Sequence, residues 1–276
     1  MVNLVLIDGN NVLYRSHFAR PQQIDDRGPV QGIAGLADMV LQRYLKWKPE
    51  SIVVCWDSPE KTFRHELYPA YKGNRKATPE DLVNSIPRAK KALTNLGISQ
   101  AEYVGFEADD VIGTLANQAE QEGRSAIIIS GDRDFWQLIT RNVAMEYLQA
   151  KKPRQMLTLN RFIELYKIDP PQILDLKAIA GDHSDNIPGV PGIGEKTIWP
   201  LLQQGVGLKE FLEFPSLLPP RQAKQIEKYK DQALLSRKLA EIRKDVPIKW
   251  QLGTINLSTS LSKKTLQALG LRRLIA

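Results

Sequence analysis

Short apolar runs that each lead into an aspartate are the feature that most constrains the fold of this chain. Three such runs, over 2–7, 51–56 and 125–130, have the continuous apolar character of strands buried on both faces. A fourth strand is expected over 143–147. Segments with helical spacing separate the runs, and strands that alternate with helices form mainly parallel sheets. The sequence therefore predicts an α/β fold with helices on both faces of the sheet.

The pattern changes at two places along the chain. Prolines and a glycine exclude a regular helix over 58–78, and a capped helix is then expected over 78–97. From about 159 the chain is mostly helical, in short pieces divided by prolines. We therefore expect an α/β core over 1–158 and a helical C-terminal region over 159–276.

Each of the three buried strands is followed by an acid, Asp8, Asp57 or Asp132. Because the carboxyl ends of parallel strands lie along one edge of the sheet, where ligands bind, these carboxylates should approach one another. A single aspartate in this position could be an ordinary turn or cap residue. Three together would repel one another unless a cation neutralised them.

Further acids are expected near the same edge, from the start of a helix near 107, the turn after 130 and the loop over 181–186. They are Glu107, Asp109, Asp110, Asp134, Asp182 and Asp185. An alternative role for the acids in the first helical turn is simply to cap the helix, because the helix dipole favours negative charge there. Clusters of oxygen ligands suit Mg²⁺ or Mn²⁺. This number of carboxylates is more than one ion can coordinate and is sufficient for two ions. A pair of bound metal ions catalyses displacement at phosphorus.

Basic residues accompany the acids, and the net charge of +7 favours a polyanionic partner. The run over 61–76 interleaves five basic residues with three aromatic ones, a composition that suits single-stranded nucleic acid, although a solvated loop is the alternative. Glycines over 189–194 could form a phosphate-binding turn or a plain helix connection. The run over 221–244 has eight basic residues and three acids, and could be a DNA contact or a solvated helix face.

Six motifs in this order resemble the 5′ nucleases, a family that comprises phage flap endonucleases and the N-terminal 5′–3′ exonuclease domain of bacterial DNA polymerase I. The motifs are LIDGN at 6–10 with YR at 14–15, FRHE at 63–66 with YKGNR at 71–75, EADD at 107–110, GDRD at 131–134, GDHSDN at 181–186 and GVPGIGEKT at 189–197. The resemblance implies a 5′ flap endonuclease and 5′–3′ exonuclease that uses two Mg²⁺ ions, with Mn²⁺ as a substitute.

The resemblance also assigns roles to residues. The first metal site would comprise Asp8, Asp57, Glu107 and Asp109, and the second Asp110, Asp132, Asp134, Asp182 and Asp185. The segment over 58–97 resembles an arch that gates the 5′ strand, with Lys72 and Arg75 reaching the scissile phosphate. A helix–hairpin–helix around 185–204 would grip duplex DNA, with a K⁺ ion on its backbone carbonyls. Further DNA contacts are implied for Arg15, Arg64, Tyr71, Gly192, Gly194 and Lys196.

Two positions depart from the family pattern. His183 stands where an acid is common, and Trp199-Pro200 is expected to interrupt the helix after the hairpin. The sequence leaves two alternative functions to compare with this one. A DNA-structure binding protein without hydrolysis would have no need of the intact set of acids, which are costly to bury. A topoisomerase–primase-type domain would use Asp132 and Asp134 but would leave Asp8 and Asp57 without roles.

The remaining features concern the setting of the protein. One cysteine, Cys55, allows no internal disulfide and fits a reducing cytoplasm, and no signal peptide or membrane span is readable. We therefore expect a free-standing cytoplasmic monomer that acts on DNA with 5′ flaps, nicks or single-strand/duplex junctions. A polymerase or ligase partner cannot be read from the sequence.

Overall fold

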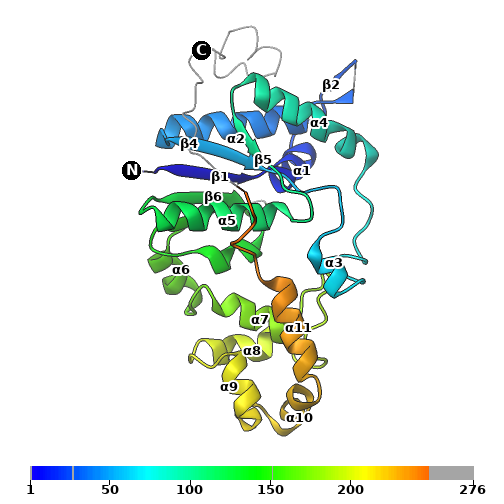
Figure 1. Cartoon of the computed structure of the whole chain (residues 1–276), viewed down its shortest axis with the longest axis vertical. Coiled ribbons are helices and arrows are strands. Elements are labelled where there is room, and N and C mark those ends of the chain that lie inside the picture. The colour runs from blue at the N-terminus through cyan, green and yellow to red at the C-terminus, as the bar shows by residue number, and fades with distance from the viewer. Residues whose placement is uncertain (1, 27, 151, 249–276) are drawn as a thin grey trace.

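A computed structural model describes residues 2–26, 28–150 and 152–248 of the chain (Figure 1). Its central sheet has six strands in the order β5-β4-β1-β6-β7-β8. The strands are β1 (Leu4–Asp8), β4 (Ser51–Cys55), β5 (Ser99–Ala101), β6 (Ala126–Ser130), β7 (Val143–Tyr147) and β8 (Gln155–Leu157). All neighbouring strands are parallel except β7 and β8, which are antiparallel. The mainly parallel sheet with flanking helices confirms the predicted fold class.

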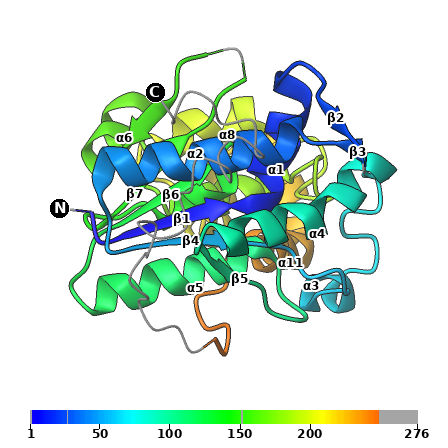
Figure 2. The ribbon, with the colours of Figure 1, turned by 90° about the horizontal axis from the view of Figure 1, so that it is seen from above.

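Strand β1 lies in the middle of the sheet and pairs with β4 on one side and β6 on the other (Figure 2). All five of its residues are buried. Leu4 and Leu6 pack into the core on one face, and Val5 and Ile7 pack into the core on the other. This burial on both faces explains why the strand has no polar residue before Asp8.

Helices cover both faces of the sheet (Figure 1). Above it lie α1 (Gly9–Ala19), α2 (Gln31–Trp47) and α4 (Glu80–Asn95), and below it lie α5 (Ala108–Gln121), the 3₁₀ helix η1 (Arg133–Leu138) and α6 (Leu159–Tyr166). The α4 bounds confirm the helix predicted over 78–97. The segment over 58–78 contains a short helix, α3 (Phe63–Leu67), which was not expected. A capping box between Thr62 and His65 allows this single turn before Pro69.

The chain after residue 167 forms the lower part of the molecule (Figure 1). Its elements are α7 (Gln172–Ala180), α8 (Glu195–Leu202), α9 (Leu208–Glu213), η2 (Pro215–Leu217), α10 (Pro220–Lys228) and α11 (Lys230–Ala240). The last of these packs against α7 and leads the chain back to the sheet. A small ribbon of β2 (Ile24–Asp25) and β3 (Gly28–Pro29) completes the described elements. In the part of the chain that the structure describes, no helix has the length and apolar character needed to cross a bilayer.

The expectation that Trp199-Pro200 interrupts the helix after the hairpin is wrong. Helix α8 continues through Pro200 to Leu202. An interior proline costs a helix about 3 kcal/mol. Ile198 and Leu202, on either side of Pro200, are fully buried. Burial of each side chain contributes about 1.5–3 kcal/mol to the stability of the fold. Tertiary packing therefore outweighs the tendency of proline to end a helix.

Pro200→Ala should raise the free energy of unfolding by about 1–3 kcal/mol, because it removes the ring and restores a backbone donor for the Lys196 carbonyl. Urea denaturation measures the change. Pro220→Ala is the matched control, since Pro220 begins α10, where proline is tolerated, and it should give no gain. Equal effects of the two substitutions would contradict this account of α8.

Candidate active site at the carboxyl edge of the sheet

Four carboxylates line one cavity of about 490 Å³ at the carboxyl edge of the sheet: Asp8, Asp57, Asp109 and Asp132. Asp8 ends β1, Asp57 and Asp132 follow β4 and β6, and Asp109 stands in the first turn of α5. Lys72 and Arg75 line the same cavity. The parallel topology thus brings together acids that are more than a hundred residues apart in sequence.

Hydrogen bonds from neighbouring polar side chains hold the strand ends in register. The Ser130 hydroxyl donates to Asp8 Oδ2 at 2.7 Å and accepts from the backbone N–H of Asp132 at 3.1 Å. The side-chain oxygen of Asn11 accepts from the Gly131 N–H, and that of Asn10 accepts from the Asp57 N–H, both at 3.0 Å.

Sequence reasoning missed Asn10, Asn11 and Ser130. The two asparagines directly after Asp8-Gly9 were a usable signal for the first pair, since asparagine commonly bonds to nearby turns. Ser130 gave no such signal, because a serine at a strand end has no distinctive pattern. Its role becomes visible only when β6 lies beside β1.

The acids at this edge carry negative charge that the protein does not neutralise. The pKa of Asp8 is raised to about 7, mainly because the carboxyl is buried. Hydrogen bonds from Asn11 and Ser130 lower this pKa, while the charges of Asp57 and Asp132 raise it. Burial, followed by the charges of Asp8 and Asp132, also raises the pKa of Asp109 well above its usual range. A bound cation would relieve this repulsion.

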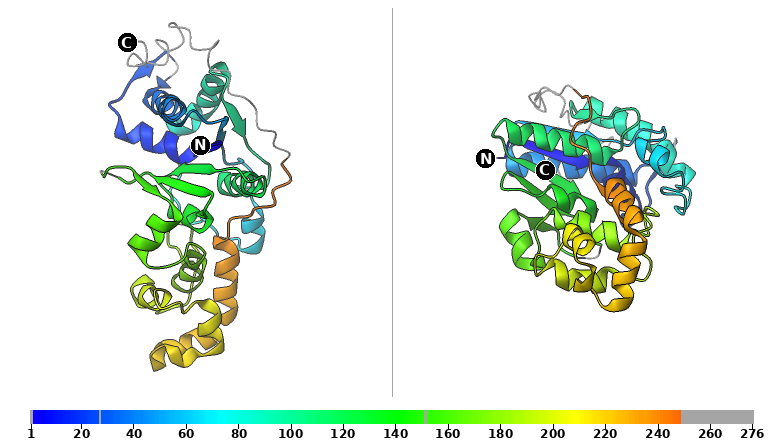
Figure 3. Two further views of the ribbon diagram at one scale, coloured as in Figure 1. Left: turned by 90° about the vertical axis from the view of Figure 1, so that its left-hand side faces the viewer. Right: turned by 60° about the horizontal axis from the view of Figure 1, so that its bottom comes forward.

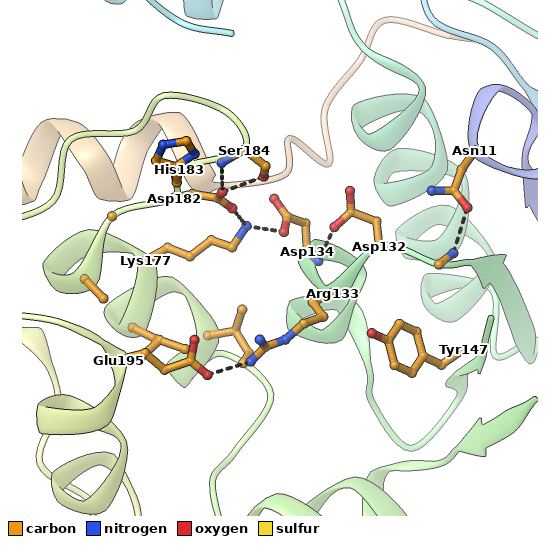
Figure 4. A pocket seen from close by; sticks show the side chains of 15 residues that line it. Asn11, Asp132, Arg133, Asp134, Tyr147, Lys177, Asp182, His183, Ser184 and Glu195 are labelled. Atoms are coloured by element: carbon orange, nitrogen blue, oxygen red, sulfur yellow. Dashed lines mark hydrogen bonds and ion pairs between the residues drawn. The ribbon is translucent and has the colours of Figure 1, made fainter. Parts of the chain in front are cut away.

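A second group of acids is paired with side-chain cations. Lys72 Nζ lies 2.8 Å from Glu107 Oε1, and Arg75 pairs with Asp185. Lys177 lies between Asp134 and Asp182 and pairs with both, as Figure 4 shows. Asp134, Asp182 and Lys177 line a second cavity, of about 410 Å³, together with Arg133 and Glu195.

Lys177 is a further residue that sequence reasoning missed. It is a mostly buried lysine in the largely apolar helix α7, five residues before Asp182. Burial alone would lower its pKa, but the two carboxylates raise the pKa above its ordinary value. Lys177 in turn keeps the pKa of Asp182 low despite burial. The lysine is therefore charged and neutralises part of the edge.

The donor set fits a hard divalent cation, although the ligands are not gathered around one point. Within the described ranges, no three His, Cys, Asp or Glu side chains stand in a ready-made arrangement around a single ion. All the donors at the edge are carboxylate oxygens, which Mg²⁺ and Mn²⁺ prefer. Burial and the neighbouring carboxylates raise the pKa values of Asp8 and Asp109, and a bound cation would favour the ionised forms of both.

Two expectations, that Arg64 contacts DNA and that Asp110 binds a metal, do not fit the structure. Arg64 is 2% exposed and donates to both oxygens of Asp110 at 2.7 and 2.8 Å and to the carbonyls of Leu239 and Glu241, each at 2.8 Å. Asp110 is fully buried and also accepts from the Arg243 N–H. Both oxygens of Asp110 and all three guanidinium nitrogens of Arg64 are thus engaged inside the protein.

Tyr71 is also expected to contact DNA, but only 3% of the residue is exposed. Its ring is therefore not available for stacking on a base. Its hydroxyl lies 3.2 Å from Glu107 Oε2 and 3.1 Å from Asp185 Oδ2. Tyr71 therefore bridges two acids of the edge. The aromatic spacing in 61–76 could not distinguish a stacking residue from one that packs inward.

The other predicted DNA contacts are on the surface or at the cavities. Gly192, Gly194 and Lys196 are exposed on the hairpin that joins α7 to α8. Gly192 has φ +80°, a conformation that suits glycine, and an added Cβ there would meet no atom within 4 Å. The hairpin is supported from below by α11, where the Ser236 hydroxyl accepts from the Gly189 N–H at 3.0 Å. Arg15 is half-buried on α1.

The fold and site together define a class: an α/β protein with a row of acids at the carboxyl edge of its sheet and an exposed helical hairpin beside them. The chain belongs to the 5′-3′ exonuclease family. The model of that family's N-terminal resolvase-like domain matches residues 3–167, and the model of its C-terminal SAM fold matches residues 168–263.

Several relatives support this placement. The chain is 39% identical to the 5′-3′ exonuclease of Bacillus subtilis (strain 168), over 89% of its own length and 84% of the relative. It is 37% identical to the 5′-3′ exonuclease of Buchnera aphidicola, over 96% and 94% of the two chains. It is also 39% identical to DNA polymerase I of B. subtilis, but spans only 28% of that protein.

Solved structures share the fold at lower sequence identity. The T5 5′-exonuclease with bound divalent metal ions has a TM-score of 0.75 at 20% identity and covers 99% of this chain and 98% of its own. Flap endonuclease-1 from Methanococcus jannaschii has a TM-score of 0.57 at 17% identity, with 99% and 94% coverage.

Replacing Arg64 by Met should lower the free energy of unfolding by about 3–5 kcal/mol, since it leaves the Asp110 charge buried without a partner. Chemical denaturation measures this. The double substitution Arg64→Met with Asp110→Leu should recover much of the loss, because it removes both charges. A single variant as stable as the wild type would show that Arg64 is not a structural partner of Asp110.

Proposed function

We propose that this chain hydrolyses phosphodiesters in DNA near 5′ ends, as a 5′ flap endonuclease and 5′–3′ exonuclease that uses two divalent cations. The observation that carries the proposal is the row of unneutralised acids, Asp8, Asp57, Asp109 and Asp132, in one cavity with Lys72 and Arg75. Mg²⁺ is the expected ion and Mn²⁺ its substitute. Related folds solved with divalent metal ions and with DNA support the proposal.

We assign the first ion to Asp8, Asp57, Glu107 and Asp109, and the second to Asp132, Asp134, Asp182 and Asp185. Asp110 is omitted because Arg64 and backbone donors use both of its oxygens. When bound, two ions would activate the attacking water and stabilise the leaving oxygen. Lys177 would exchange its contacts with Asp134 and Asp182 for new ones, since the ion would take over the neutralisation of those acids.

Lys72 and Arg75 are the donors that would hold the scissile phosphate. Each is paired with an acid of the site, Glu107 or Asp185, and these acids would turn to a cation in the loaded enzyme. Lys72 has φ +55° and its N–H donates to the Asp185 carbonyl at 2.9 Å, so the backbone fixes where its side chain begins. The planar donors of Arg75 suit two phosphate oxygens.

We further propose that the exposed hairpin at Gly192, Gly194 and Lys196 grips duplex DNA, with a K⁺ ion on its carbonyls. Arg15 would contact DNA beside the acid edge. The basic run over 221–244 forms α10 and α11, and its residues Lys224 and Lys228 are exposed on α10. This exposure makes a phosphate contact feasible for that helix.

Asp132→Asn should lower the single-turnover rate of 5′-flap cleavage by more than tenfold, since the carboxylate serves the transition state, and should leave DNA affinity within a few-fold. A 5′-labelled flap in Mg²⁺ and in EDTA gives both values. Asp231→Asn, an exposed acid on α11, is the control and should cleave normally. If Asp132→Asn kept a tenth or more of the wild-type cleavage rate, the substitution would have raised the barrier by about 1.4 kcal/mol or less. That result would rule out the assignment of Asp132 as a metal ligand.

Ser130→Ala should raise the Mg²⁺ concentration for half-maximal cleavage by about tenfold, because it frees the Asp8 carboxylate and the Asp132 N–H from their shared partner. A metal titration of the cleavage rate measures the shift, and Ser130→Thr should restore part of it. Ser51→Ala is the control: the Ser51 hydroxyl is buried at the other end of β4 with no hydrogen-bond partner among the described residues. Equal metal dependence in all four proteins would refute the positioning role.

Saturating Mg²⁺ should raise the melting temperature of the wild type by about 5–10 °C, since an ion at a hundred times its dissociation constant contributes about 2.7 kcal/mol. Ca²⁺ should also stabilise but support little cleavage. The double substitution Asp8→Asn with Asp132→Asn should melt higher than the wild type in EDTA and gain less from metal. Identical wild-type melts with and without metal would disprove a cation site in the free protein.

A further inference from the structure

A third cavity, of about 220 Å³, lies beside the acid edge between α1, α2 and the segment that follows β7. Four basic side chains line it: Arg15 from α1, Arg20 directly after α1, and Lys152 and Arg154 from the loop before β8. We call this cavity the basic pocket. The left view of Figure 3 shows α1, in blue, and the β7–β8 hairpin, in green, on the same side of the molecule.

The basic pocket depends on a close contact between α1 and α2. A Cβ atom on Gly35 of α2 would lie 2.5 Å from Ser16 Cβ and 2.9 Å from Arg20 Nε, so only glycine permits this approach. The Arg20 guanidinium consequently lies against α2, where it pairs with Asp38 at 2.7 Å. The Ser16 hydroxyl, also in the lining, can donate a further hydrogen bond.

The acids near the basic pocket are already engaged. Asp38 accepts from Arg20 and from Gln42. Glu146 is also buried, and its carboxylate accepts hydrogen bonds from two guanidinium nitrogens, Nε and Nη2, of the buried Arg43. The Arg154 guanidinium comes no closer to Glu146 than 3.9 Å.

Positive charge therefore exceeds negative charge at the basic pocket. Within the described part of the chain, Arg15 and Lys152 have no ion-pair partner. Burial, followed by the charge of Arg43, lowers the pKa of Arg154 even though Glu146 and Asp38 are near. An anion bound in the pocket would relieve this crowding of cations.

The size of the pocket indicates what kind of anion it takes. Pockets that bind small molecules usually measure about 300–1,000 Å³, so 220 Å³ is too small for a nucleotide and suits one tetrahedral phosphate. Arginine donors match the geometry of phosphate oxygens, and lysine adds a point charge. Two of the four basic side chains, Lys152 and Arg154, are exposed to solvent, from which a backbone phosphate could enter the pocket.

The basic pocket adjoins the candidate active site. A Cβ atom on Gly131 would lie 2.8 Å from an Arg15 guanidinium nitrogen, so Arg15 connects the pocket to the loop that carries Asp132. At the end of β7, Tyr147 lines the cavity between the acids and the hairpin, and the next residue, Leu148, lines the basic pocket. A DNA backbone that passes the acids can thus continue over the end of β7.

We propose that the basic pocket binds a backbone phosphate of the DNA duplex at a point beyond the acid edge, on the side of β7 and β8. This inference rests on the proposed function, in that DNA is the ligand. It adds a third contact region to the acid edge and the hairpin between α7 and α8. A duplex held on both sides of the acids would be fixed in register with respect to Asp132.

The test measures binding without cleavage. A fluorescein-labelled 5′-flap duplex is titrated with full-length protein in EDTA, at several salt concentrations. Lys152→Glu and Arg154→Gln should each weaken binding by about threefold or more and flatten the log–log salt slope by about 0.9 for each lost phosphate contact. Arg141→Glu is the matched control, because Arg141 is an exposed arginine at the opposite end of β7. It should bind like the wild type.

A series of duplexes shortened one base pair at a time on either side of the flap junction locates the contact. The difference between Lys152→Glu and wild type should vanish once one arm no longer reaches the pocket. Equal affinities and salt slopes for Lys152→Glu, Arg154→Gln and wild type on the longest duplex would overturn the proposal. An equal loss for Arg141→Glu would also overturn it, since the effect would then be one of net charge.

Inorganic phosphate distinguishes the two sources of the anion. If phosphate raises the melting temperature of the wild type but not of Lys152→Glu, while both bind DNA equally, the pocket is a site for free phosphate and the proposal fails. These outcomes are separate from those for the proposed function. A wild type that binds DNA but does not cleave it in Mg²⁺ would refute the nuclease assignment and leave the pocket assignment intact.

Discussion

Electrostatic repulsion among carboxylates at the end of β1 is the constraint on which the rest of the site depends. The parallel sheet places Asp8, Asp57 and Asp132 side by side, and burial makes the ionised form of Asp8 costly. The Ser130 hydroxyl and the Asn11 backbone N–H offset part of the cost by donating hydrogen bonds to Asp8, but they supply no charge. The protein therefore has a strong requirement for positive charge at this edge, which explains both the cations that surround it and the ions that we propose to bind there.

Side-chain cations meet that requirement in two different ways. Lys72, Arg75 and Lys177 pair with acids at the rims of cavities, where a phosphate or a metal ion can compete for their partners. Arg64 is different, because it is buried with Asp110 and ties α5 to the carbonyls at the end of α11. Whether the cation lines one of these cavities thus separates residues that can take part in chemistry from those that hold the fold together.

The distribution of charge around the acid edge explains how such a protein can approach a polyanion. The net charge is +7, the basic pocket lies beside the acids, and Lys196, Lys224 and Lys228 are exposed on the C-terminal helices. DNA would be attracted over the whole face and repelled only where the acids lack their ions. Binding and cleavage are thereby separable, and the proposed experiments exploit this by measuring one in EDTA and the other in Mg²⁺.

The sequence by itself determined the sheet, because the apolar runs over 2–7, 51–56 and 125–130 have the continuous apolar character of strands buried on both faces. It also predicted which acids lie at the carboxyl edge, since that follows from strand direction alone. Only the tertiary structure decided that Arg64 and Tyr71 point inward, that α8 continues through Pro200 and that Lys177 neutralises two acids. Local pattern cannot decide these points, because a side chain's orientation and a helix's tolerance of proline depend on the free energy of packing against segments far away in the sequence.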